Sequence, residues 1–320
     1  MFMYKMYNTD IKTNETTEVK EFKKGNWINM IAPTAEEIKA VCKGLKISEE
    51  FIKYPLDSEE KARIDIEEDE QTTLFIMDIP VMEKEGNTEI YSTMPLGMLI
   101  VRDEYFVTIS LRKNKLIENL EKKMLKEITT YKKSRLILQL FYTNSAMFLK
   151  LLKQINKETE IAESVLKTSM KNKELLKLLS LEKSLVYFTT SLKSNELVME
   201  KTMRGKIIKL YDEDEDILED AIIENKQAIE MSQIYSNILN GTMDAYASII
   251  SNNLNSVMKF LTSITIVIAV PTLIASYWGM NVPVPLQENP HGFLWIVGAS
   301  VLLGILAYIW LKKKDMLNKN

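Results

Sequence analysis

Residues 260–281 read FLTSITIVIAVPTLIASYWGMN, and residues 292–311 read GFLWIVGASVLLGILAYIWL. Each run holds about 20 uncharged residues, enough for an α-helix to cross the roughly 30 Å hydrocarbon core of a bilayer. The only formal charge from Phe260 to Leu311 is Glu288, which lies between the two runs. We therefore predict two transmembrane helices near the C-terminal end of this chain of 320 residues.

The charges that flank the two runs predict their orientation. Lys259 precedes the first run and Lys312–Lys314 follow the second, whereas the connecting loop, Val282–His291, has no lysine or arginine. The positive-inside rule then places both termini in the cytoplasm and the loop outside. Aromatic residues near the run ends fit a membrane interface; they are Trp278, Trp295, Tyr308 and Trp310.

Composition excludes several classes of protein. The net charge of −3 provides no basic footprint for nucleic acid. With one cysteine, Cys42, and one histidine, His291, the chain cannot form an intrachain disulfide framework or a Cys/His zinc cluster. There is no GxxxxGK[ST] nucleotide loop and no convincing pair of catalytic carboxylates, so we do not expect an enzyme. The unpaired cysteine fits a reducing compartment.

Prolines and glycines divide the part of the chain that precedes the membrane runs. Residues 1–112 carry four prolines and several β-branched and aromatic runs, which predict a cytoplasmic α/β domain. Residues 113–217 are rich in Leu, Ile, Lys and Glu at helical spacing, which predicts long cytoplasmic helices. Residues 218–281 predict a stalk helix that continues into the first transmembrane helix. Residues 282–291 are the outer loop, and residues 292–320 are the second transmembrane helix with its basic tail.

Within the α/β domain, Ala35–Cys42 reads as a helix with Thr34 as its N-cap. The expected strands are Glu18–Phe22, Trp27–Ile31, Arg63–Glu67, Thr72–Ile79, Thr88–Ser92, Gly97–Arg102 and Tyr105–Ser110.

One face of the first predicted transmembrane helix carries small and polar residues. Their separations of 3, 4, 3, 4, 3 and 4 residues define a heptad seam, and the other faces are Phe, Leu, Ile and Val. A lone helix in lipid has no need of such a stripe, whereas several copies around an axis bring their stripes together. The seam therefore predicts either a tightly packed bundle or a water-filled pore. Its members are Asn255, Met258, Thr262, Thr265, Ala269, Thr272 and Ser276.

The outer end of this helix carries a recognisable motif. Gly279-Met280-Asn281, which closes the first of two C-terminal spans, resembles the signature of the CorA family of magnesium channels. The sequence MKFLT at 258–262, Pro271 in mid-span and the lysine-rich tail are similar to the family as well. So is the layout, in which an α/β domain precedes long helices and two spans.

The resemblance implies a CorA-like homopentameric funnel, with an α+β cytoplasmic domain, long stalk helices and two C-terminal transmembrane helices. It implies membrane-potential-driven influx of hydrated Mg²⁺ and gating by cytoplasmic Mg²⁺. Gly279, Met280 and Asn281 would be the selectivity filter. Residues along the pore or its gate would be Asn255, Met258, Leu261, Ala269 and Thr272, to which the seam adds Thr265. Leu261 lies beside the seam, and Ala269 is smaller than the residue expected there.

Acids outside the spans are candidates for further ion contacts. By its distance from Gly279, Asp220 matches an acid that in the family binds Mg²⁺ between neighbouring subunits; Glu219 and Asp216 lie close to it. In the family, the second acid of this site lies on the α/β domain of the neighbouring subunit. The corresponding position here falls near Tyr54, which is not an acid, so Asp57 or Glu59 would have to replace it. The same acids also fit a solvated helix N-terminus. Glu288 would form an acidic outer rim or stay a solvated loop acid.

Two alternatives remain open from the sequence. A zinc or cobalt/nickel transporter of the same superfamily would share the layout, although Met280 favours magnesium because related zinc transporters carry another residue there. A membrane-anchored helical signalling or scaffold protein would explain the long helices, but not a seam that ends in Gly-Met-Asn. We expect a multi-pass protein of the plasma membrane that contacts divalent metal ions, lipid and further copies of itself.

Overall fold

The computed structural model describes residues 4–85, 88–124, 129–168, 172–205, 207–314 and 316. The chain divides into two compact units, Met1–Asn240 and Gly241–Asn320.

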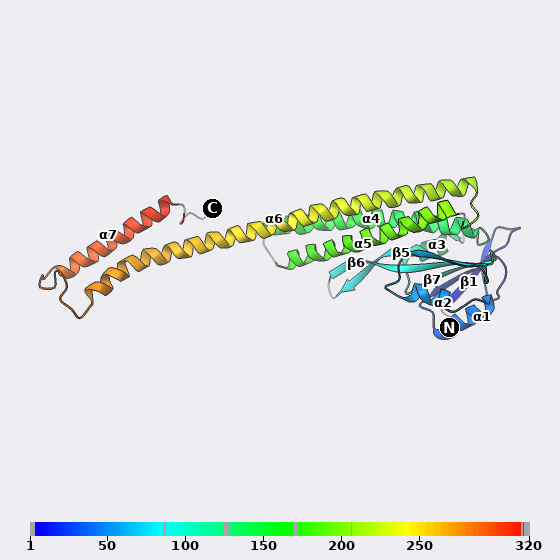
Figure 1. Cartoon of the computed structure of the whole chain (residues 1–320), viewed down its shortest axis with the longest axis horizontal. Helices are drawn as coiled ribbons and strands as arrows, with labels where there is room; N and C mark the ends of the chain where they lie inside the picture. Colours follow the sequence, from blue (N-terminus) through cyan, green and yellow to red (C-terminus); the bar gives the residue numbers. More distant parts are fainter. Residues whose placement is uncertain are drawn as a thin grey trace. The chain divides into compact units, whose positions relative to one another are not determined.

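The first unit is built on a seven-stranded sheet of order β2-β1-β3-β7-β6-β5-β4. Figure 1 shows β5 and β6 of this sheet running alongside the long helix α5 (Asn172–Gly205). Strands β3 and β7 are parallel, and all other neighbouring pairs are antiparallel. The strands are β1 Tyr4–Thr9, β2 Thr16–Val19, β3 Trp27–Ile31, β4 Arg63–Glu67, β5 Thr72–Glu85, β6 Thr88–Val101 and β7 Tyr105–Ser110.

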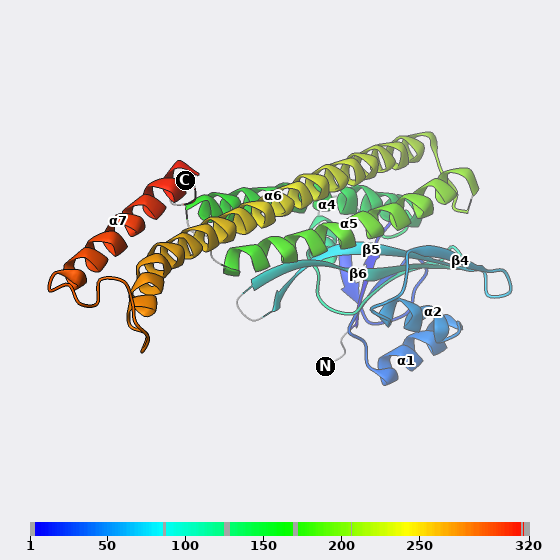
Figure 2. The ribbon, with the colours of Figure 1, turned by 60° about the vertical axis from the view of Figure 1, so that its left-hand side comes forward.

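Helices cover both faces of the sheet, so the unit has three layers (Figure 2). On one face lie α1 (Ala35–Leu45), α2 (Glu50–Lys53) and the short 3₁₀ helix η1 (Tyr54–Leu56). The other face is covered by α3 (Lys115–Met124), α4 (Lys133–Thr168), α5 (Asn172–Gly205) and the first turns of α6 (Asp212–Trp278). This arrangement confirms the α+β domain with long helices that the sequence predicts.

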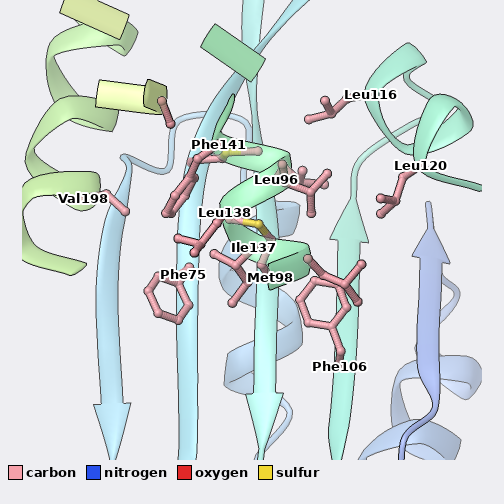
Figure 3. Packing of buried hydrophobic residues seen from close by; sticks show 14 of the residues in the cluster. Phe75, Leu96, Met98, Phe106, Leu116, Leu120, Ile137, Leu138, Phe141 and Val198 are labelled. Atoms are coloured by element: carbon pink, nitrogen blue, oxygen red, sulfur yellow. The ribbon is translucent and has the colours of Figure 1, made fainter. Parts of the chain in front are cut away.

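Alternation along the strands explains the two hydrophobic cores. Leu74 and Ile76 of β5 face α1 and α2, whereas Phe75 and Met77 face the long helices, as a period of two requires. Figure 3 shows Phe75 beneath Phe141 of α4, and their rings meet edge to face with centroids 6.4 Å apart.

Several predicted element bounds are confirmed and others are wrong. Trp27–Ile31, Arg63–Glu67 and Tyr105–Ser110 are strands as expected. Thr34 caps α1 through a capping box with Glu37, although the helix continues to Leu45.

The strands predicted at Thr88–Ser92 and Gly97–Arg102 are one strand, β6, that passes through Pro95. Pro95 can lie within β6 because it is one residue beyond the last pair that β6 makes with β7. Its missing N–H therefore costs no hydrogen bond between these two strands. The strand predicted at Glu18–Phe22 lies instead at Thr16–Val19, where β2 pairs with β1, an unpredicted strand. Likewise, β5 continues beyond Ile79 to Glu85, because it stays paired with β6 over its whole length.

Two buried asparagines complete the open edge of β5. Strand β4 pairs with β5 only as far as Ile76, so the backbone at Asp78 needs other partners. The Asp78 N–H donates to Asn195 Oδ1 (2.8 Å), and its carbonyl accepts from Asn195 Nδ2 (2.8 Å) and Asn144 Nδ2 (2.9 Å). These bonds attach α4 and α5 to the sheet at a fixed register.

The second unit contains the remainder of α6 and α7 (Gly292–Lys313). Helix α6 begins at Asp212, six residues before the stalk start that the sequence suggests, and ends at Trp278. Pro271 is inside it. Both helices are long and apolar enough to cross a membrane, and only 6% of the apolar window of α6 is buried, unlike the core helix of a soluble protein.

Candidate functional site

One face of α6 packs against α7 within the second unit. Ser263 is fully buried, and its hydroxyl lies 2.8 Å from the Lys259 carbonyl oxygen and 3.2 Å from that of Met316, beyond α7. At the middle of the pair, Gly304 of α7 lies against Pro271, where a Cβ on Gly304 would be only 3.2 Å from Pro271 Cγ. A glycine at this crossing lets the two backbones approach closely, as small residues do between membrane helices.

The small and polar stripe lies on another face of α6. At 100° per residue, its centre is roughly 150° around the helix from the residues that face α7. All seven members of the stripe are exposed: Asn255, Met258, Thr262, Thr265, Ala269, Thr272 and Ser276. The hairpin of α6 and α7 therefore leaves the stripe uncovered.

The threonine hydroxyls of the stripe can accept hydrogen bonds from water. Thr265 Oγ1 donates to the Leu261 carbonyl and Thr272 Oγ1 to the Ile268 carbonyl, each at 2.9 Å. Because each hydroxyl uses its one proton within the helix, its oxygen lone pairs are the groups left to face outward. Such acceptors suit the hydration shell of a cation.

Apolar side chains precede the threonines on the same helix. Met258 is 52% exposed and Leu261 57% exposed, with Asn255 exposed before them. Two large apolar side chains at this depth can form a constriction if further copies bring equivalent residues together.

The Gly-Met-Asn segment directly follows α6. Gly279 N still donates to the Ala275 carbonyl (2.9 Å), and Met280 N lies 3.4 Å from the Tyr277 carbonyl oxygen, so Asn281 is the first residue beyond these helical bonds. Gly279 does not adopt a positive φ. Its backbone therefore continues the helical path of α6 for one more residue. Met280 and Asn281 are exposed.

Residues 22–313 match the family model described as CorA-like Mg²⁺ transporter protein. The chain belongs to this family. It is 30% identical over 299 residues to the cobalt/magnesium transport protein CorA of Methanocaldococcus jannaschii, with 90% of each chain covered. It is 22% identical to the magnesium transport protein CorA of Helicobacter pylori, with 91% of this chain and 90% of the relative covered.

Solved structures give the same result for the fold. The complete structure of the CorA magnesium transporter from M. jannaschii superposes with a TM-score of 0.81 at 28% identity, covering 97% of both chains. The agreement extends over the α/β domain, the long helices and both membrane helices. The CorA-like architecture that the Gly-Met-Asn motif suggests is thereby confirmed.

The acids suggested for a CorA-like regulatory site are exposed but are not brought together within one chain. Asp57 follows η1, and Asp216, Glu219 and Asp220 lie on the first turns of α6. Asp220 lines a cavity of about 380 Å³ with Asn119, Lys123 and Gln139. In the part of the chain that the structure describes, no three or more His, Cys, Asp or Glu residues could hold a metal ion.

Two neighbouring acids of α6 have a structural role that the sequence did not indicate. Arg135 of α4 donates to Asp214 Oδ1 (2.9 Å) and to Glu213 Oε2 (2.5 Å). The hydrogen bond and charge of Arg135 lower the pKa of Glu213. Asp214 is buried, so this contact fixes the start of α6 against α4.

The loop that follows the motif is held by hydrogen bonds. Its acid, Glu288, is exposed. Trp278 Nε1 donates to the Pro285 carbonyl (3.0 Å), and Val284 N donates to Gln287 Oε1 (3.3 Å). The sequence marks Trp278 only as an interfacial aromatic residue and contains no signal for this bond.

Proposed function

We propose that the chain is a magnesium channel in which five copies surround a pore lined by the stripe of α6. The observation that carries this proposal is the position of the stripe. It faces away from α7, runs the length of the first membrane helix and leads to Gly279-Met280-Asn281. Six exposed small or polar side chains along one face of this helix, with Met258 among them, are explained if copies of the helix meet around water.

The residue types suit an ion that keeps its water. Mg²⁺ dehydrates reluctantly and holds an octahedral shell. A ring of Asn281 carboxamides would offer neutral acceptors to that shell, whereas a ring of carboxylates would bind the ion too tightly for release. The outward lone pairs of Thr265 and Thr272 would continue the path, and Ala269 leaves it wider between them.

Met258 and Leu261 are the proposed gate. Rings of these side chains would exclude water when they close, which stops conduction without a charged barrier. Asn255 lies on the cytoplasmic side of this constriction. Inward flow would be driven by the membrane potential, which contributes about 4.6 kcal/mol for two charges at 100 mV.

Gating by cytoplasmic Mg²⁺ would require acids from neighbouring copies. The described part of one chain offers no group of three potential ligands, so Asp216, Glu219 or Asp220 of one copy would have to combine with Asp57 of the next.

The flanking lysines and the uncharged outer ends of the helices support a plasma-membrane protein with both termini in the cytoplasm. Glu288 would then lie at the outer mouth and concentrate cations.

Cobalt is the principal alternative cargo, because the M. jannaschii relative is named as a cobalt/magnesium transport protein. Zinc and nickel are the other divalent candidates of the same superfamily. Family membership disfavours a role as a scaffold alone or as an enzyme.

The test is uptake into proteoliposomes that contain a Mg²⁺-sensitive dye, with an imposed negative-inside potential. Wild type should take up Mg²⁺, and Asn281→Ala should lose most of the uptake. Asn252→Ala is the matched control, because Asn252 is an exposed asparagine of α6 that lies off the stripe. Uptake of Co²⁺ or Zn²⁺ without Mg²⁺ would change the cargo, and no uptake of any cation by an assembled oligomer would refute the channel.

A further inference from the structure

The indole of Trp278 closes the chain around the Gly-Met-Asn segment. Trp278 is the last residue of α6, and its Nε1 donates to the carbonyl of Pro285, 3.0 Å away and seven residues later. The residues enclosed by this bond include Gly279, Met280 and Asn281. The bond therefore limits the paths that the backbone can follow between the helix end and the outer loop.

The acceptor is itself held in place. Leu286, which follows Pro285, has φ of +66°, an uncommon conformation for a bulky residue. Its carbonyl accepts from Asn289 N (3.2 Å). A Cβ added to Gly292, the first residue of α7, would lie only 2.4 Å from the same Leu286 carbonyl oxygen. Any residue other than glycine at this position would therefore displace that carbonyl. The Pro285 carbonyl is thus a defined anchor point and not part of a freely moving loop.

Trp278 differs from the other tryptophans of the second unit. Trp295 is 66% exposed and Trp310 59% exposed, whereas Trp278 is partly buried. Among the hydrogen bonds of the described residues, the Trp278 indole has an acceptor and no bond from the Trp295 or Trp310 indole is found. Trp295 and Trp310 fit aromatic residues that face lipid, and Trp278 fits a residue that shapes the loop.

We propose that Trp278 is a positioning residue for ion selection. Its indole N–H, bonded to Pro285, fixes the turn from Gly279 to Asn281 and thereby the place of the Asn281 carboxamide. This inference rests on the proposed function, in which the Asn281 carboxamide contacts the hydrated ion. Recognition of a water shell depends on acceptors held at fixed positions, so a looser turn should weaken discrimination between cations before it stops flux.

The test is Trp278→Phe, which keeps an aromatic ring and removes the donor. Initial influx into proteoliposomes is measured against external Mg²⁺, together with the ratio of Mg²⁺ to Ca²⁺ influx. Loss of one neutral hydrogen bond should raise the half-saturating Mg²⁺ concentration by roughly fivefold and lower the ratio by a similar factor. Maximal flux at saturating Mg²⁺ and the size of the oligomer should not change. Trp295→Phe is the control and should change none of these quantities.

Wild-type half-saturation and ion ratio in an assembled Trp278→Phe channel would overturn the inference. If that variant does not assemble, benzothienylalanine at position 278, which replaces the indole N–H by sulfur in a ring of the same shape, is measured by the same criteria. Asn281→Ala separates the two proposals. If Asn281→Ala alters Mg²⁺ uptake and Trp278→Phe does not, only the positioning role fails; if Asn281→Ala also behaves as wild type, the filter assignment fails with it.

Discussion

The crossing of the two membrane helices allows a quantitative test with a matched control. In Gly304→Leu, the first added carbon would lie 3.2 Å from Pro271 Cγ, closer than the 3.5–4.0 Å of an ordinary carbon contact. The rest of the leucine must enter the same crossing, beside the Val267 carbonyl oxygen at 3.9 Å. Overpacking of this kind costs about 1–3 kcal/mol, so we expect the free energy of unfolding to fall by about 2 kcal/mol.

Gly298→Leu is the control, because Gly298 is in the same helix and a Cβ added there would have no heavy atom of another element within 4 Å. Both substitutions replace glycine by leucine and gain the same helix propensity, so their difference reports the packing at Pro271. The assay is SDS-induced unfolding in mixed micelles, followed by circular dichroism. Gly298→Leu should not lower stability, and its gain in helix propensity should raise it by up to about 1 kcal/mol. Equal effects of the two substitutions would refute the close approach of α6 and α7 at this point.

Two further predictions concern the first unit. Burial raises the pKa of Asp78 from 3.8 to about 6, so between these values the folded state keeps a proton that the unfolded state loses. Stability should therefore decrease as pH rises from about 3 to 7, by about 3 kcal/mol in total. Asp78→Asn should abolish this dependence in thermal melts at different pH values, and an unchanged pH profile would contradict it. Arg135→Leu leaves the buried Asp214 carboxylate without its cation and should cost about 2 kcal/mol in chemical unfolding, whereas Arg204→Leu, which breaks an exposed pair, should cost less than about 1 kcal/mol. Equal losses in the two arginine variants would show that the contact with Asp214 contributes no more than a surface pair.

The membrane part of the fold was predictable because its signals are local. Twenty uncharged residues in a row indicate a span, and a stripe at separations of three and four residues indicates one helix face, whatever the rest of the chain does. The seam alone therefore indicates the face of α6 that α7 leaves uncovered. What the spacing left open was whether that face meets other copies in a dry bundle or around water.

The sheet was harder to predict because strand ends depend on distant partners. Pro95 looks like a strand break in the sequence, but β7 ends at Ser110 and leaves that edge of β6 without a ladder bond to lose. The first strand, Tyr4–Thr9, was missed because Lys5 and Asn8 interrupt its strand-favouring residues, and its place in the sheet depends on pairing with β2 and β3.

The site residues missed by sequence reasoning depend on contacts across the chain or on backbone conformation. Glu213 and Asp214 belong to an acidic run, yet Arg135, 79 residues before Asp214, converts them into a structural clamp. The bond from Trp278 to Pro285 depends on a loop in which Leu286 has a positive φ, which no residue pattern predicts.

The central claim, that the stripe of α6 lines an ion pathway, is tested most directly by cysteine accessibility during Mg²⁺ influx. The chain has one native cysteine, Cys42, which is buried and whose thiol pKa is raised to about 11 by burial, so it should not react. Single cysteines are introduced at Thr272 on the stripe and at Ile274 on the face toward α7, and a small cationic methanethiosulfonate is added from outside. We predict that influx through Thr272→Cys is blocked within the time that leaves Ile274→Cys unaffected. Equal block of both variants, or block of Ile274→Cys alone, would contradict the claim.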